Sequence, residues 1–405
     1  MVEKSTVVID NGGCYIRAGL LGQTHPRRIT PNALARGKRD KRTYVGDKIL
    51  GSPVAEYILT RPSQQGLVLD WECQKVIWEY GAFLRDKSGT SFNILSDAPS
   101  LTVVVTVASF SPSSVKREFL DVLFNDYGFH RAALIDASVA TQFSPGITSQ
   151  FTEEDWKNPC GLLIDCGFSA ITIIPVYNTQ PVLKASQRLP VGGRLLNNLL
   201  RERLAYLQID LDDNPLLIQH IKESVCHVAT GGLPAALKDL QSMAPKDNIG
   251  YVLPDFSSSN SPFFGSVVLS ESDVPPGSQA IKIGADRLAV PEALFNPSTF
   301  GIDKLGIAEA VARAVSLCDP AIRGPVASKI IVSGGTAMMP GFLERLQNEL
   351  ESTLRTEAPV SHIRLISESD GRCDLSSWRG TSQVASNEDD LAFLGAVYKS
   401  DWQRP

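Results

Sequence analysis

The clearest pattern in the chain is an apolar run that ends in an acidic, glycine-rich turn. Residues 7–9 are apolar and β-branched, Asp10 and an Asn-Gly-Gly sequence follow, and the chain returns through residues 15–20. Apolar β-branched residues that lead into Asn and Gly predict a β-hairpin. The pattern recurs at residues 162–176, where Asp165 again ends the apolar run. We therefore predict two hairpins, one in each half of the chain, that face each other across one ligand.

The remaining hydrophobic pattern alternates strands with helices. Residues 101–107 form a run rich in β-branched residues, which predicts a strand buried on both faces, and residues 113–124 follow with helical spacing. Residues 71–84 also show helical spacing, and Asp70 stands where an N-cap is expected. The same reasoning predicts a second helical unit or a strand-to-helix unit at 131–143, and a strand, turn and helix at 329–341. It also predicts helices at 53–59, 195–207, 215–228 and 307–317. This succession predicts an α/β architecture.

Two segments interrupt the succession. Residues 151–159 are polar and acidic, which makes them the best candidate for a boundary between the two halves. Residues 231–284 are rich in Ser, Pro and Gly, and we interpret them as an irregular insertion.

Composition narrows the class of protein. The 405 residues are 43% hydrophobic and 20% charged with a formal net charge of -5, which is typical of a globular protein and argues against a broad nucleic-acid surface. The basic run at 36–42 is a local exception, and it is either a solvated loop or a patch for nuclear import or an acidic partner. The seven cysteines include no Cys-x-x-Cys pair, so neither a zinc module nor a disulfide framework is indicated. No apolar run approaches the roughly 18 residues of a membrane span, and we expect no membrane partner.

The two hairpin turns carry groups that suit a polyphosphate. We expect their backbone N–H groups to contact phosphates, and Asp10 and Asp165 to hold a hydrated Mg²⁺ between them. Arg17 is expected to supply positive charge for a phosphate. A third glycine-rich turn, at residues 332–336, precedes a helix and favours the close approach of a nucleotide, although a tight packing turn is the alternative interpretation.

Four short motifs together resemble the actin superfamily, and the similarity runs from residue 7 to residue 398. The motifs are Asp-Asn-Gly at Asp10 with Ala-Gly at Ala18, Tyr-Val-Gly-Asp at Tyr44, Pro-Glu-Ala-Leu-Phe-x-Pro-Ser at Pro291, and Ser-Gly-Gly-Thr-x-Met-x-Pro-Gly at Ser333. The resemblance implies an α/β, actin-like (duplicated ribonuclease H-like) two-domain fold with a central nucleotide cleft. Within the superfamily, residues 251–257 and 296–302 look most like the nuclear branch of actin-related protein 6.

The resemblance also implies a domain division and a set of nucleotide contacts. The first half would comprise residues 1–154 plus 371–405, with 33–66 as its small subdomain. The second half would comprise residues 155–370, with 191–302 as its small subdomain and the insertion at about 231–284 inside it. The implied cofactor is ATP or ADP, with Mg²⁺ held by no direct protein ligand, and an empty cleft is the alternative. The residues at the family's contact positions are Asp10, Gly12, Gly13, Cys14, Arg17, Asp165, Gly167, Phe168, Ser169, Gly193, Lys222, Glu223, Gly334, Gly335, Thr336, Met338 and Met339.

Several positions depart from the actin pattern in the groups that hydrolysis uses. Gly13 stands where actins have a Ser that contacts the phosphate. In the second hairpin, Phe168 replaces a carboxylate, Ser169 replaces a Gly, and Thr172 replaces a His that orients water. The catalytic Gln expected near Ala137 is absent as well. Because hydrolysis needs a positioned water molecule, we predict negligible ATPase activity, and so a protein that is not an enzyme.

The function implied by the resemblance is that of a non-catalytic scaffold subunit in a Swr-type chromatin-remodelling complex, which exchanges a histone variant. The implied partners are the remodeller's ATPase subunit, a zinc-finger subunit and nucleosomal components, and the implied location is the nucleus, with the cytoplasm as a second location. No homopolymer is expected, because residues 37–43 offer no apolar side chain to fill a partner's pocket. The alternatives are an active ATPase or ATP-dependent kinase of the same superfold, and a cytoskeletal actin variant.

Overall fold

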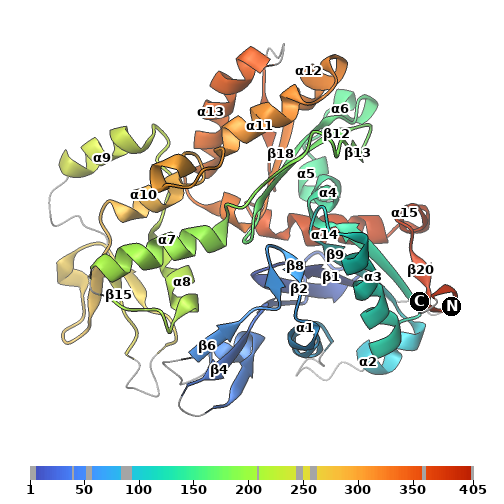
Figure 1. Ribbon diagram of the computed structural model, residues 1–405, viewed down its shortest axis with the longest axis horizontal. Coiled ribbons are helices and arrows are strands. Elements are labelled where there is room, and N and C mark those ends of the chain that lie inside the picture. Colours follow the sequence, from blue (N-terminus) through green and yellow to red (C-terminus); the bar gives the residue numbers. More distant parts are fainter. Residues whose placement is uncertain are drawn as a thin grey trace.

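The structure is a computed structural model that describes residues 6–38, 41–51, 57–83, 94–207, 209–242, 250–255, 262–357 and 362–402. The chain forms two α/β halves, each built on its own sheet, and Figure 1 shows them side by side. The α/β architecture expected from the sequence is therefore confirmed. None of the helices in the described ranges is both long and apolar enough to cross a membrane.

The first half contains a sheet with helices on both faces. Its strand order is β20 (Val397–Tyr398), β10 (Arg131–Asp136), β9 (Thr102–Val107), β1 (Thr6–Asn11), β2 (Tyr15–Leu20) and β3 (Arg28–Pro31). Strand β1 pairs antiparallel with β2 and parallel with β9, which confirms the first hairpin. On one face, Val7 lies in a cluster with Trp78 of α1 (Trp71–Trp78) and neighbouring apolar side chains. On the other face, Val8 lies in a cluster with Trp378 of α14 (Ser376–Ala385), so the end of the chain returns to this half.

The second half repeats this arrangement. Its strands are β13 (Gln180–Pro181), β12 (Ile171–Tyr177), β11 (Gly161–Cys166), β18 (Lys329–Ser333) and β19 (Arg364–Ile366), with β14 (Gln187–Leu189) also paired to β12. Strand β11 pairs antiparallel with β12 and parallel with β18, so the second hairpin is confirmed as well. Leu162 and Ile164 of β11 face the main core of this half, which the helices α7 (Gly193–Tyr206), α8 (Pro215–Val225), α11 (Ile307–Ser316) and α13 (Phe342–Glu357) complete.

Other predicted helices also form at their expected places. Helix α1 begins after Asp70, whose side chain accepts a hydrogen bond from the Cys73 backbone N–H, as expected of an N-cap. The predicted boundary at 151–159 contains a short helix, α6 (Glu153–Lys157). The remaining helices are α2 (Ile94–Asp97), α3 (Ser113–Asp121), α4 (Ala137–Ala140), α5 (Pro145–Thr148), α10 (Asp286–Glu292), α12 (Pro320–Ser328) and α15 (Glu388–Phe393), and β7 (Ser63–Gln64) pairs with β8 (Leu67–Val68).

Two sequence predictions were wrong. The helix predicted at 53–59 is a strand where it is described, because residues 57–60 form β6 (Tyr57–Thr60), which pairs with β4 (Leu34–Gly37); residues 53–56 lie outside the described ranges. The insertion at 231–284 is not irregular. It contains α9 (Leu233–Ser242) and a three-stranded antiparallel sheet of β16 (Ser266–Val268), β15 (Gly250–Val252) and β17 (Ala280–Lys282). In both places the strands are too short to show a hydrophobic period, and they pair with segments elsewhere in the chain.

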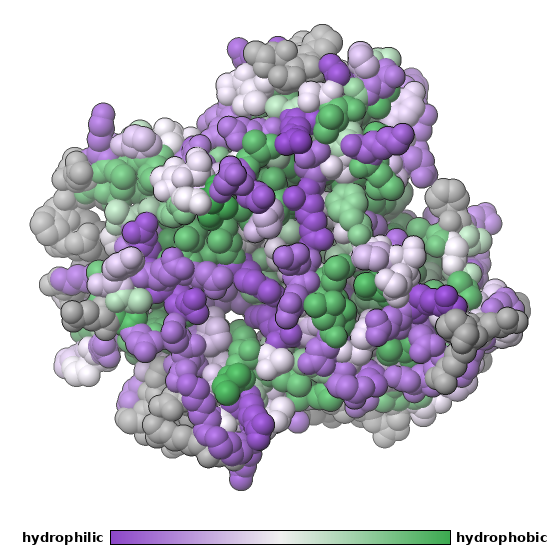
Figure 2. All heavy atoms as spheres, viewed as in Figure 1, coloured by the Kyte–Doolittle hydropathy of each residue, from purple (hydrophilic) through white to green (hydrophobic). Residues whose placement is uncertain are grey.

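The two halves also meet away from their large sheets. Strands β5 (Thr43–Val45), β4 and β6 form a small sheet in the first half, and α8 belongs to the second half. A hydrophobic cluster joins them, which we call the bridging cluster and which consists of Ala33, Ala35, Ile49, Tyr57 and Leu216, with Phe263 and Phe264 packed against it. The Tyr57 backbone N–H donates to the Asp213 carbonyl oxygen at 3.5 Å, and the Lys38 ammonium forms an ion pair with Asp213. These contacts close the small parts of the two halves against each other. The space-filling view in Figure 2 shows polar and apolar side chains interspersed over the face that it presents.

Candidate nucleotide cleft

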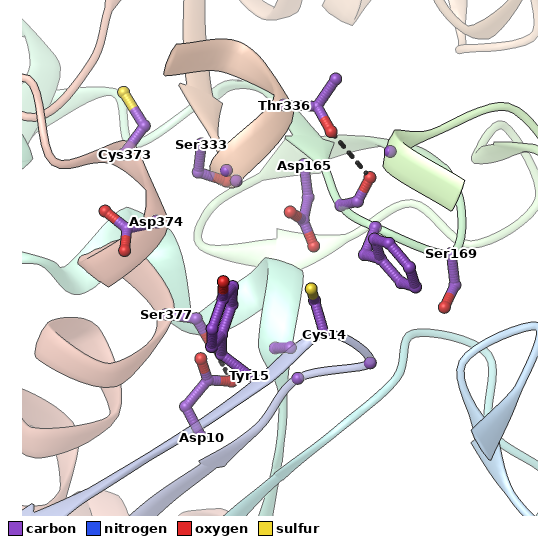
Figure 3. Close-up of a pocket in the computed structure, with 18 of the residues that line it drawn as sticks. Asp10, Cys14, Tyr15, Asp165, Ser169, Ser333, Thr336, Cys373, Asp374 and Ser377 are labelled. Atoms are coloured by element: carbon purple, nitrogen blue, oxygen red, sulfur yellow. Dashed lines mark hydrogen bonds between the residues drawn. The ribbon is translucent and has the colours of Figure 1, made fainter. Parts of the chain in front are cut away.

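A cavity lies between the two halves, where the carboxyl ends of β1 and β11 approach each other. Its volume is about 530 Å³, within the roughly 300–1,000 Å³ range that is typical of small-molecule sites. Figure 3 shows Asp10, Cys14 and Tyr15 from the first half on one side and Asp165, Ser333 and Thr336 from the second half on the other. The structure brings together every predicted contact residue, since the lining includes Asp10, Gly12, Gly13, Cys14, Arg17, Asp165, Gly167, Phe168, Ser169, Gly193, Lys222, Glu223, Gly334, Gly335, Thr336, Met338 and Met339.

Asp10 is held by hydrogen bonds within the first half. Its Oδ1 accepts a hydrogen bond from Thr106 Oγ1 at 2.8 Å, and its Oδ2 accepts one from Arg17 at 3.0 Å. Asp10 and Arg17 are direct partners in the register of β1 and β2, so their side chains share one face of the hairpin. Arg17 also donates to Asp374 Oδ2 at 3.2 Å. The charge of Arg17, which the sequence assigned to a phosphate, is therefore already paired with two carboxylates.

Asp165 ends β11 as Asp10 ends β1, and it connects to a chain of hydroxyl groups. Its Oδ2 accepts a hydrogen bond from Ser138 Oγ at 2.9 Å, and Ser109 Oγ lies 2.8 Å from Ser138 Oγ and 2.6 Å from Asp136 Oδ1. The pKa of the Asp165 carboxyl is raised to about 6, chiefly by burial; the negative charges of Asp10 and Asp136 also raise it, while the Ser138 hydrogen bond lowers it. Burial also raises the pKa of Asp136. Asp165 is thus a carboxyl group that changes protonation close to neutral pH.

The two hairpin turns meet at one end of the cavity. A Cβ atom at Gly13 would lie 2.7 Å from Ser169 Oγ, so a larger residue at position 13 needs Ser169 to move. Phe168 fills the adjacent space, since its Cδ1 would lie 3.9 Å from that Cβ and its Cδ2 3.1 Å from a Cβ on Gly193. Gly13, Phe168, Ser169 and Gly193 therefore form one packed junction between the halves.

The beginning of α7 is bound to the second hairpin. The Gly193 backbone N–H donates to the Gly167 carbonyl oxygen at 3.2 Å, and the Arg194 backbone N–H donates to the Phe168 carbonyl oxygen at 2.8 Å. These N–H groups of the helix N-terminus consequently have partners within the protein. Lys222 of α8 is buried and donates to the Gly193 carbonyl oxygen at 3.3 Å, and burial lowers the pKa of its ammonium group.

The third glycine-rich turn follows β18 and packs on the second hairpin. Gly334 has a φ of +90°, a conformation that favours glycine, and a Cβ atom there would collide with the Cys166 carbonyl oxygen. Thr336 Oγ1 donates to the Gly167 carbonyl oxygen at 3.0 Å. The turn also lines the cavity, as do Met338 and Met339 beside it. Both interpretations of this turn, a packing turn and a cavity wall, agree with its contacts.

Comparison with known proteins decides the family. The family model described as Actin matches residues 1–216 and 211–403. The chain belongs to the actin family. It is 29% identical to "Actin-like protein arp6" of Aspergillus fumigatus over 99% of this chain and 93% of that protein. It is also 29% identical to "Actin-related protein 6" of Drosophila melanogaster over 89% of each chain, and 27% identical to "Actin-related protein 6" of Oryza sativa over 95% of this chain and 93% of that protein.

The two-domain actin fold expected from the resemblance is thereby confirmed, and the cavity lies between the two halves of that fold. The cavity lining also includes residues that were not predicted from the sequence as contact residues, namely Thr106, Ser109, Ser138, Arg188, Asp374 and Ser377. Ser138 lies within the unit predicted at 131–143, two residues after the end of β10, and could have been found as a polar residue that follows a strand. Arg188 and Asp374 gave no local signal, because distant parts of the chain bring them to the cavity.

The cleft of this actin-family chain suits a nucleotide in size and in the character of its two ends. Met338 and Met339 offer an apolar wall, whereas the two glycine turns and the carboxylates Asp10 and Asp165 form a polar end. Within the described ranges, no group of three or more His, Cys, Asp or Glu residues is placed to hold a metal ion directly. Since Asp10 and Asp165 already accept hydrogen bonds, a bound Mg²⁺ would contact them through its water molecules, which this ion commonly retains.

Proposed function

We propose that the chain is a non-catalytic actin-related scaffold subunit of a Swr-type chromatin-remodelling complex that exchanges a histone variant. Its cleft holds ATP or ADP with Mg²⁺ without hydrolysing it. The observation that carries the non-catalytic part is the composition of the cleft: neither a histidine nor a glutamine occurs among the described residues that line it. Phosphoryl transfer to water depends on a residue that orients the water molecule, so this cleft is suited to binding and not to turnover.

The role as a scaffold draws support from the way the cleft joins the two halves. Residues of both halves line it, so a ligand there contacts both and stabilises their arrangement. A ligand that binds only the folded protein, at a free concentration of about 100 times its Kd, stabilises the fold by about 2.7 kcal/mol. The bridging cluster adds a second connection between the halves. A rigid two-domain body of this kind presents constant surfaces to partner proteins.

Phosphate release tests the non-catalytic part of the proposal. The full-length chain is incubated with Mg²⁺ and ATP, and the Asp165→Ala variant is treated in parallel as the matched control. We expect no steady phosphate release above that of the variant. Hydrolysis at a rate like that of actin, abolished by Asp165→Ala, would show that the cleft is catalytic.

The proposed partners are the remodeller's ATPase subunit, a zinc-finger subunit and nucleosomal components, and the proposed location is the nucleus, with the cytoplasm as a second location. The support is the similarity to chains named actin-related protein 6 in several organisms. Size-exclusion chromatography of the endogenous protein, followed by identification of the proteins that co-elute, tests this. We expect elution in one large complex with a remodeller ATPase; elution of the whole pool as a free monomer contradicts the proposal.

An ATPase or ATP-dependent kinase is the second candidate, because one observation favours it. The pKa of the Asp165 carboxyl is raised to about 6, chiefly by burial, which suits a general base near neutral pH. The phosphate-release experiment distinguishes an ATPase from a scaffold. A cytoskeletal variant, the third interpretation, is tested by sedimentation in polymerising salt: we expect the protein to stay in the supernatant, and sedimented filaments would contradict the scaffold.

A further inference from the structure

Asp374 lines the cleft at a place where the chain crosses from the second half to the first. It belongs to a short 3-10 turn, Cys373–Leu375, that directly precedes α14. The Gly334 backbone N–H donates to the Cys373 carbonyl oxygen at 2.9 Å, and a Cβ atom on Gly335 would lie 3.8 Å from the Asp374 Cβ. The glycine-rich turn after β18, in the second half, therefore positions Asp374, which Figure 3 shows beside the cavity.

The first hairpin supplies a partner for Asp374. Arg17 of β2 donates from Nη2 to Asp374 Oδ2 at 3.2 Å and from Nη1 to Asp10 Oδ2 at 3.0 Å. The guanidinium group of Arg17 lies against the first glycine-rich turn, because a Cβ atom on Gly12 would be 3.5 Å from Arg17 Nη1. The Arg17–Asp374 ion pair consequently connects the glycine turn of the first half with the glycine turn after β18, and both of its members line the cavity.

A second guanidinium group holds the Asp374 carboxylate in this position. Arg372 donates from Nε to Asp374 Oδ1 at 2.8 Å and from Nη2 to Asp374 Oδ2 at 3.0 Å, which is the two-bond geometry of a strong ion pair. Burial raises the pKa of Asp374, but the hydrogen bonds from Arg372 and the positive charge of Arg17 lower it, and the net shift is downward. The side chains of Arg17 and Asp374 are only 11% and 13% exposed, so solvent ions screen the pair weakly.

We propose that Asp374 occupies the place of a ligand's anionic group at Arg17: it joins the two halves when the cleft is empty, and it competes with a ligand's phosphate for the guanidinium group. The competition rests on the proposed nucleotide-holding function, and it identifies a residue that sets the affinity of the cleft for phosphate-bearing ligands. A phosphate at the Gly12 turn meets an Arg17 charge that two carboxylates already balance, and the Asp374 charge repels it. The folded arrangement of the halves is then independent of the ligand.

Replacing Asp374 by Asn separates the two parts of this inference. The variant side chain keeps its size and one acceptor oxygen, but it has no charge. Without a ligand, Asp374→Asn should unfold more easily than the wild type, because the poorly exposed Arg17 guanidinium loses one of its two counter-ions. A phosphate restores that negative charge, so the variant should bind a phosphate-bearing ligand more tightly than the wild type does.

Calorimetric titration of the full-length, nucleotide-free protein with Mg-ADP and with adenosine, which has no phosphate, tests the competition. Asp374→Asn is expected to bind Mg-ADP at least about tenfold more tightly than the wild type and to bind adenosine with unchanged affinity. Asp370→Asn is the matched control and should keep both wild-type affinities, because Asp370 pairs with Arg379 and is not among the described residues that line the cavity. Urea unfolding without ligand tests the joining of the halves: the midpoint of Asp374→Asn should be lower than that of the wild type, and saturating Mg-ADP should reduce the difference.

The outcomes distinguish the competition from a purely structural role and from the nucleotide-holding function. A structural role alone lowers the urea midpoint without tightening Mg-ADP binding, so equal or weaker binding by Asp374→Asn overturns the competition while the protein still holds a nucleotide. An equal gain in affinity for adenosine also overturns it. If neither protein binds Mg-ADP, the nucleotide-holding function is wrong and the competition with it, whereas an unchanged urea midpoint overturns the joining of the halves.

A measurement on the wild type covers the case in which Asp374→Asn fails to fold. The side-chain nitrogen NMR resonances of Arg17 report on the acceptors of its N–H groups. Mg-ADP is expected to shift these resonances, because a phosphate replaces the Asp374 carboxylate, and adenosine is expected to leave them in place. Resonances that saturating Mg-ADP does not shift overturn the competition.

Discussion

Replacing Asp165 by Asn should change the way stability depends on pH. Burial is the largest cause that raises the pKa of the Asp165 carboxyl, from an ordinary value of 3.8 to about 6. The folded protein therefore holds this proton at pH values where the unfolded chain has released it. By linkage, the stabilising effect is fully present below the unfolded-state pKa and is lost as the pH rises through the folded-state pKa. The side-chain amide that Asp165→Asn introduces does not titrate, and its oxygen can still accept the hydrogen bond from Ser138.

The size of the effect follows from the two pKa values. A rise from 3.8 to about 6 corresponds to about 3 kcal/mol of unfolding free energy over the whole titration. Between about pH 4.5 and about pH 6.5, the wild type should lose about 2 kcal/mol of stability relative to Asp165→Asn. Most of that loss should occur before the pH passes about 6, where the folded-state carboxyl is half ionised.

Urea unfolding of the nucleotide-free protein at several pH values measures this difference. Asp155→Asn is the control, because Asp155 is shifted in the opposite direction. Burial raises the pKa of Asp155, but the hydrogen bonds from Arg364 and Thr152 and the charge of Lys329 lower it to about 2. Asp155 is therefore ionised in both states throughout the measured range, and the difference between this variant and the wild type should be constant there. A constant difference for Asp165→Asn as well would refute the reasoning.

Two further predictions concern the contacts between the halves. Leu216→Ala removes a buried side chain from the bridging cluster and should cost about 2 kcal/mol or more of local stability. Amide hydrogen exchange in β4 and β6 should then accelerate by about thirtyfold. Truncation of the half-exposed Leu207 is the control and should not accelerate it. Gly13→Ser places a side chain against Ser169 Oγ and should lower the free energy of unfolding, measured by heat or urea, by about 1 kcal/mol or more. The double variant with Ser169→Gly should recover most of that free energy. Equal losses in the single and the double variant would show that the two positions are independent.

The sequence predicted the parts of the fold that short segments specify. Each hairpin places apolar residues before a turn, and its two strands are adjacent in the chain, so that β1 with β2 and β11 with β12 could be paired without knowledge of the rest. The parallel neighbours β9 and β18 are likewise fully buried strands with apolar β-branched residues at their centres. Within each of the two sheets, the carboxyl ends of the parallel strands lie at one edge. Residues at both edges line the cavity between the halves, which is why the predicted contact residues come together there.

The errors fall where structure depends on partners that are distant in the chain. Residues 57–60 form a strand that pairs with β4. Tyr57, Ile58 and Thr60 favour a strand, but four residues are too few to specify which strand they pair with. In the insertion, β15 pairs with both β16 and β17, each only three residues long. Strands of this length show no measurable hydrophobic period, so the Ser, Pro and Gly content dominated the interpretation. Even so, their pairing contributes a buried Tyr251 and Ile281 to the core of the second half.

Contacts between distant parts of the chain also determine the chemistry of the cleft, because they decide which groups a single residue binds. Arg17 has the charge and the position that a phosphate contact requires, yet Asp374, 357 residues further along the chain, shares it with Asp10. Phe168 differs from the family pattern at one position, and the guanidinium groups of Arg61 and Arg194 lie over its ring although no motif connects them to it. Gly13 and Ser169 also depend on each other, since a side chain at one position needs the space of the other. The departures from the actin pattern are therefore coupled through direct contact, and a single substitution toward that pattern should not restore the geometry that hydrolysis requires.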